Sequence, residues 1–171
     1  MDHIDITQMT FACTSSLYLD PTQVGSETQE TSYKNNAGGN VTFDEMLSFL
    51  DKPLLTNRLI VKVLDKGTVS DSLMGSSVVN LNKLDLQEEE ERDLVVDVEH
   101  KGKPAGKVVL SLTRRAVPSG AWAGPFQVTI VAIKDFSDIL GSFGRLDPLV
   151  LCQVRYDWTC RTKQILTNTM C

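Results

Sequence analysis

Apolar and polar residues alternate in short runs along most of the chain. In the clearest run, LIVKVLD at 59–65, Leu59, Val61 and Val63 fall on one face and Lys62 falls on the other. Alternation with a period of two residues indicates a β-strand with one buried face. Similar runs occur at 76–81, 93–98, 106–112, 126–133 and 148–154, and weaker ones at 4–11, 27–33, 42–49 and 160–166.

No segment keeps the 3.6-residue period of a helix, so the pattern predicts an all-β, antiparallel fold. Polar turns separate the runs at the spacing that is typical of a β-sandwich. Residues 117–124, VPSGAWAG, have the proline and small-residue composition of a linker. The part of the chain before this linker is acidic, whereas the part after it is slightly basic.

The chain has 171 residues, of which 42% are hydrophobic and 23% are charged, and its net charge is −5. That length suits one domain with a full core, and the acidic balance argues against nucleic acid as a partner. No apolar run reaches the ~18 residues of a membrane span, and the N-terminus lacks the pattern of a secretory signal. The sequence therefore predicts a cytoplasmic protein, or one bound peripherally to a membrane, whose four cysteines are free thiols.

Three pieces of the chain, in order, resemble the C2 domain, the β-sandwich module of protein kinase C, synaptotagmins, phospholipases and ferlins. NVTFDEMLSF at 40–49 is similar to the family's Asn-Pro-x-Trp-Asn-Glu strand, with Val41 in place of proline. LIVKVLD at 59–65 leads into SDSLMG at 70–75 like the strand and third top loop of the family, and GKVVLSL at 106–112 resembles its closing strand. The resemblance implies an eight-stranded Greek-key β-sandwich over residues 1–116.

The resemblance repeats after the linker. FQVTIVAI at 126–133, the Asp-Pro pair at 147–148 with its strand to 154, and RTKQIL at 161–166 look like the first three strands of a second C2 module at 125–171. Three strands alone cannot bury their apolar faces and leave their hydrogen-bonding edges open. We therefore expect residues 125–171 to pair with the first domain, with residues outside this sequence, or with a second copy in a homodimer formed by strand exchange.

The resemblance also implies where calcium would bind, because C2 domains that hold this ion gather about five acidic side chains from two top loops. Asp20 and Asp65 match two of those positions, and Asp71 lies one residue before a third. Gly67 and Ser72 stand where the family has carboxylates, although calcium takes 6–8 oxygen ligands. The sequence thus predicts a degenerate calcium site and no required cofactor, with Asp20, Asp65 and Asp71 as the candidate ligands.

Basic residues suggest a different partner. Arg161 and Lys163 share a face at period two and Arg155 lies on the preceding strand, so these three are the candidate residues for binding anionic phospholipid. Neither of the two histidines belongs to a recognisable catalytic motif, so no enzyme activity is expected. The sequence favours a non-catalytic, calcium-independent C2 module in membrane association or scaffolding. Calcium-dependent phospholipid binding and a protein-interaction or dimerisation module remain the alternatives.

Overall fold

The computed structural model describes residues 25–51, 56–116, 124–136 and 146–157. This part of the chain forms eight antiparallel strands and one short 3-10 turn, η1 (Leu81–Lys83), which confirms the predicted all-β, eight-stranded class. The strands are β1 (Gly25–Glu30), β2 (Val41–Asp51), β3 (Thr56–Asp65), β4 (Ser72–Asn80), β5 (Glu91–His100), β6 (Lys103–Arg114), β7 (Gly124–Lys134) and β8 (Pro148–Asp157).

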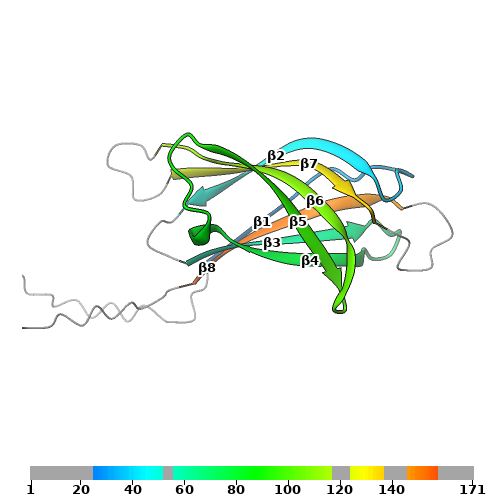
Figure 1. Ribbon diagram of the computed structural model, residues 1–171. Helices are drawn as coiled ribbons and strands as arrows, with labels where there is room; N and C mark the ends of the chain where they lie inside the picture. Colours follow the sequence, from blue (N-terminus) through cyan, green and yellow to red (C-terminus); the bar gives the residue numbers. More distant parts are fainter. Residues whose placement is uncertain (1–24, 52–55, 117–123, 137–145, 158–171) are drawn as a thin grey trace, which may run out of the picture.

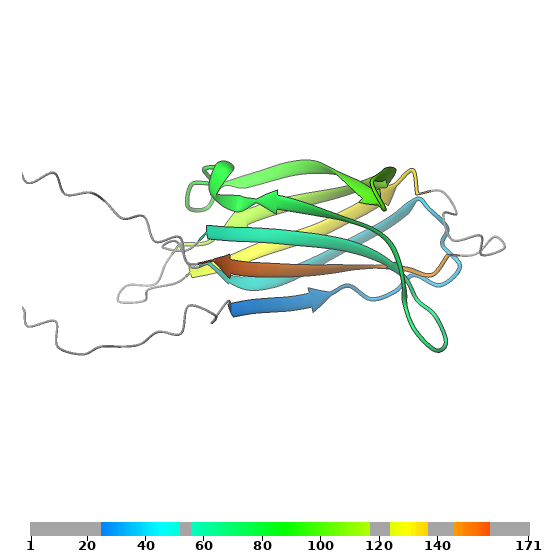
Figure 2. The same ribbon diagram turned by 90° about the horizontal axis from the view of Figure 1, so that it is seen from below.

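The strands follow one another in the order β1-β8-β3-β4-β5-β6-β7-β2. The ladder is weakest between β4 and β5, which pair only at Ser76 and Glu99 in the part of the chain that the structure describes. The sheet folds over at this point, so β5, β6, β7 and β2 form one layer across β1, β8, β3 and β4 (Figures 1 and 2). The result is a two-layered sandwich with its apolar faces inside.

The two strands that follow the predicted linker are members of these eight strands, not additions to them. β8 lies between β1 and β3, and β7 lies between β6 and β2 (Figure 1). The sequence left three possible partners open for residues 125–171. The described strands of this segment, β7 and β8, pair with strands of the first domain. The division of the chain into two modules stays a sequence-based prediction, and the expected strands at 4–11 and 160–166 lie outside the described residues.

The core is built from the inward positions of the alternating runs. Leu59, Val61 and Val63 of β3 are completely buried, as the pattern in that strand predicts. Cys152 of β8 is a buried free thiol, and loss of hydration raises its pKa to about 12, so it packs as a small apolar side chain. The remaining fully buried side chains that are largest by volume include Tyr156, Met74, Leu86, Leu110, Leu112, Ile130, Ile133 and Leu149.

Side chains close the gap between β1 and β2, the two outermost strands of the ladder. The Gln29 amide accepts a hydrogen bond from Ser48 N (3.2 Å) and donates one to Ser48 O. Leu50 N donates to the Glu27 carboxylate (3.1 Å), and the Tyr156 hydroxyl donates to Leu50 O (2.6 Å). Backbone groups of an edge strand would otherwise offer a template for foreign strands. Side chains from β1 and β8 therefore satisfy this stretch of the β2 edge.

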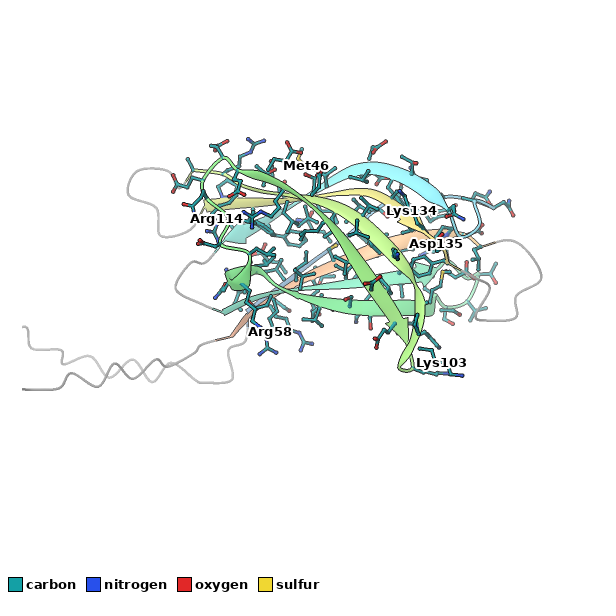
Figure 3. All side chains as sticks on the ribbon, in the orientation of Figure 1. Met46, Arg58, Lys103, Arg114, Lys134 and Asp135 are labelled. Atoms are coloured by element: carbon teal, nitrogen blue, oxygen red, sulfur yellow. The ribbon has the colours of Figure 1, made fainter. Side chains whose placement is uncertain are left out.

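Strands β5 and β6 form a hairpin through a tight turn between residues that are adjacent in the sequence. His100 pairs with Lys103, and the two residues between them, Lys101 and Gly102, have φ values of 50° and 75°. Positive φ at both central residues is the signature of a type I′ turn, whose twist matches that of the flanking strands. The hairpin extends beyond the body of the sandwich, with Lys103 at its tip (Figure 3).

Candidate functional site: a loop end and a basic sheet face

The loop end of the sandwich brings together two aspartates that are far apart in the sequence. Asp65 ends β3, and Asp147 directly precedes β8, the neighbouring strand. Asp147 N donates to the Asp65 carboxylate (2.8 Å), and Lys66 N donates to Asp147 O (2.9 Å). The Asp147 carboxylate in turn accepts from Asn36 N. The two carboxylates therefore join the start of β8 to two neighbouring loops.

Asp71 holds its own loop closed. Its carboxylate accepts from Gly67 N (3.3 Å) and forms an ion pair with the Lys66 ammonium group (3.3 Å). Asp residues commonly stabilise turns in this way. Val69, at 97% exposure, lies at the tip of this loop.

This geometry supplies few free ligands for a cation. The described residues contain no group of three or more His, Cys, Asp or Glu side chains that could hold a metal ion. Of the predicted calcium ligands, Asp65 and Asp71 lie at the loop end, and Asp20 lies outside the described residues. Asp147 is the partner of Asp65 in space. The Asp-Pro resemblance had pointed to it, but only as part of a second module.

Lys34 and Glu45 form a polar cluster beside the loop end. The Lys34 ammonium group lies 3.1 Å from a Glu45 oxygen and 5.5 Å from the centre of the Phe43 ring. Burial would raise the pKa of Glu45, but hydrogen bonds from the Ser32 hydroxyl and amide and from Lys34 outweigh it and lower the pKa below 4.5. This cluster connects the segment after β1 to β2.

The outer face of β3 and β8 carries a pair of cations. Arg155, a predicted lipid-binding residue, points outward on β8 and lies directly opposite Arg58 of β3. Both residues are exposed, and Arg58 points away from the sandwich (Figure 3). Sequence reasoning missed Arg58, because only the register between β3 and β8 makes it a neighbour of Arg155.

The rest of this face is polar or apolar. The next outward-facing pair along the two strands is Ile60 and Gln153, and the one after it is Lys62 and Leu151. On β1, Glu30 lies opposite Leu151. We call Arg58, Arg155 and Lys62 the basic face. The other two predicted lipid-binding residues, Arg161 and Lys163, lie outside the described residues.

The basic residues of β6 do not form one patch. Lys103 begins the strand at the hairpin, whereas Arg114 ends it at the other side of the sandwich (Figure 3). Arg114 donates to Leu86 O (2.7 Å), and Arg115 pairs with Glu89 (2.8 Å). These two guanidinium groups hold the loop between β4 and β5 in place.

A comparison with protein families agrees with the sandwich. The family model of the C2 domain matches residues 5–96, more than half of the chain. The chain belongs to the C2 domain family. Comparisons with curated proteins and with solved structures gave no match.

A C2 domain is a non-catalytic module that interacts with membrane lipids or with proteins, and this chain contains such a module. Among the described residues, no helix is long and apolar enough to cross a membrane. The family match covers β1 to β4 and most of β5 but ends before β6, β7 and β8.

Proposed function

We propose that this C2 domain docks onto anionic membranes without calcium, through the basic face of β3 and β8. The observation that supports this most directly is the cross-strand pair of Arg58 and Arg155, two exposed cations held side by side. An anionic headgroup at this position would be attracted to both side chains. Each basic residue near such a surface contributes about 1 kcal/mol to binding.

The physical setting of the face supports the same conclusion. Ile60 and Leu151 are partly buried apolar neighbours of the three cations, so a lipid headgroup would meet both charge and apolar surface. The carboxylates of the loop end, by contrast, already accept hydrogen bonds from main-chain amides or pair with Lys66. The proposed docking therefore relies on fixed positive charge. In a cell, such a protein would associate peripherally with the cytoplasmic face of a membrane.

Vesicle co-sedimentation tests this proposal. We expect the chain to bind phosphatidylcholine vesicles only when they contain phosphatidylserine, with the same affinity in calcium and in chelator. Arg58→Glu/Arg155→Glu should weaken binding by at least roughly 30-fold, since it removes about 2 kcal/mol of attraction and adds two negative charges that the anionic surface repels.

The matched control is Lys101→Glu/Lys103→Glu, which changes the net charge equally on the hairpin, away from the basic face. The control should retain most of the binding. If both double variants lose the same affinity, or if only calcium produces binding, the basic face is not the docking site.

Calcium-dependent docking at the loop end is the second candidate, because β3 and β8 place Asp65 and Asp147 next to each other. Asp71 of the adjacent loop and Asp20 would complete the ligand set. Calorimetric titration of the chain with calcium tests it: a binding isotherm that Asp71→Asn weakens would support this function. A flat titration up to millimolar calcium would exclude a sensor-type site.

A further inference from the structure

β1 and β2 depend on strands from the far end of the chain. Among the described residues, β1 pairs only with β8, and β2 pairs only with β7. If β7 and β8 were removed, β3, β4, β5 and β6 would remain a connected ladder, but β1 and β2 would have no strand partner. The segment 25–114 is therefore a body with two open slots, one between β1 and β3 and the other between β6 and β2.

The inserted strands also supply a large part of the core. Val128 and Ile130 of β7 are completely buried, as are Val150 and Cys152 of β8. Each fully buried aliphatic side chain contributes about 1.5–3 kcal/mol of hydrophobic stabilisation. The body thus requires a strand pair in its slots, and the requirement comes from hydrogen bonding and burial together.

Residues of the body also form hydrogen bonds with the start of β8. The Asp65 carboxylate accepts a hydrogen bond from Asp147 N. Asn36 N donates to the Asp147 carboxylate, and Lys66 N donates to Asp147 O. Thr31 likewise exchanges hydrogen bonds with Val150, through its hydroxyl and its amide. None of these contacts needs the inserted strands to come from the same chain as the body.

The length of the connection between the body and the strand pair decides whether the same chain or a second copy supplies the strand pair. Arg115 N still donates to Pro125 O (2.9 Å), so the β6–β7 ladder continues to that point. Seven residues, 117–123, lie between Ala116 and Gly124. A short connection gives the attached strand pair an effective concentration in the millimolar range, which favours insertion into its own body at lower protein concentrations.

We infer that the β7–β8 segment, residues 124–157, is an exchangeable strand pair whose partner surface is the slotted body of a second copy of this chain. In the exchanged dimer, each body receives β7 and β8 from the other copy, and the same ladders and core contacts form between chains. Each basic face is then composite, with Arg58 and Lys62 from one copy and Arg155 from the other. The exchange rests on strand pairing alone and does not depend on the proposed lipid binding.

Deletion of residues 116–124 tests this inference in the full chain. Arg115 N donates to Pro125 O, so joining Arg115 directly to Pro125 leaves no residue to turn the chain, and β7 cannot reach its own body. We expect a folded dimer with twice the mass of the parent chain, measured by light scattering. A control in which seven Gly and Ser residues replace 117–123 should remain a monomer at micromolar concentration. A folded monomer after the deletion would overturn the inference.

Complementation covers the case in which the deletion variant does not fold. Val61→Asp/Val63→Asp damages the body, and Val150→Asp/Val154→Asp damages the strand pair, because all four positions are buried. We expect each variant to be unfolded alone under reducing conditions.

Refolded together, the two variants should form a one-to-one heterodimer with one intact sandwich. That heterodimer should give about half of the parent's β-sheet signal in far-UV circular dichroism. A mixture that shows only the sum of the two unfolded spectra would overturn the inference, whatever the deletion variant does.

Discussion

The β5–β6 hairpin and the strands β7 and β8 alternate equally well in sequence, but they find their partners in different ways. In the hairpin, His100 meets Lys103 across a two-residue turn, so local backbone geometry sets the register. In β8, Tyr156 pairs with Gly25 and Asn57, which lie far away along the chain. The hairpin is determined locally, whereas β7 and β8 are held by burial and by the slots that receive them.

The largest expected effect is the difference in stability cost between a charge at a buried position of β8 and a charge at an exposed position of β5. Val150→Asp places a charge at a completely buried position between β1 and β3, and should cost about 3–5 kcal/mol, a large share of the roughly 5–15 kcal/mol that stabilises a typical domain. Val95→Asp, on the outer face of the hairpin at 64% exposure, should change stability by less than about 0.5 kcal/mol. Urea unfolding followed by circular dichroism measures both. Similar costs for the two variants would mean that β8 is not part of the core.

A smaller effect compares two glycines of the hairpin. A Cβ at Gly106 would lie 2.5 Å from the Phe136 ring, which packs there from the end of β7, so Gly106→Ala should cost about 1–3 kcal/mol. A Cβ at Gly102 would meet nothing, and the positive φ of 75° alone should make Gly102→Ala cost about 1 kcal/mol.

A double-mutant cycle sharpens this comparison. Phe136→Ala should recover part of the loss in Gly106→Ala and none of the loss in Gly102→Ala, because only Gly106 is in contact with the ring. Equal recovery for both glycines would place the strain in the turn and not in the long-range contact.

The smallest effect concerns the pH dependence of the link between β1 and β2. Because hydrogen bonds from Ser32 and Lys34 lower the pKa of Glu45 in the folded protein, its ionised form stabilises the fold above pH 4.5. This contribution is lost as the pH falls through the lowered pKa. Glu45→Gln should therefore lower the Tm slightly at neutral pH, with the difference from the parent disappearing in acid. A difference that is the same at every pH would show that the Glu45 charge has no role.

Most strands and their inward faces were predictable from the sequence. The runs at 59–65, 93–98, 126–133 and 148–154 all lie within observed strands, because a side-chain period of two directly reports a half-buried strand. The resemblance to the C2 family was confirmed by the family match. Of the candidate site residues, Asp65 and Asp71 lie at the loop end and Arg155 lies on the outer face of β8, and their roles in binding calcium or lipid stay predictions. Arg58 and the link between Asp65 and Asp147 were not foreseen.

The sequence by itself determined which segments are strands, which side of each strand is buried, and where the β5–β6 turn lies. Only the tertiary structure decided that β7 and β8 enter the same sandwich as β1 to β6, and that two arginines stand side by side on its surface. The reason is physical. Backbone donors and acceptors are the same in every strand, so alternation encodes a buried face but not a neighbour, and partners are selected by packing over the whole sheet.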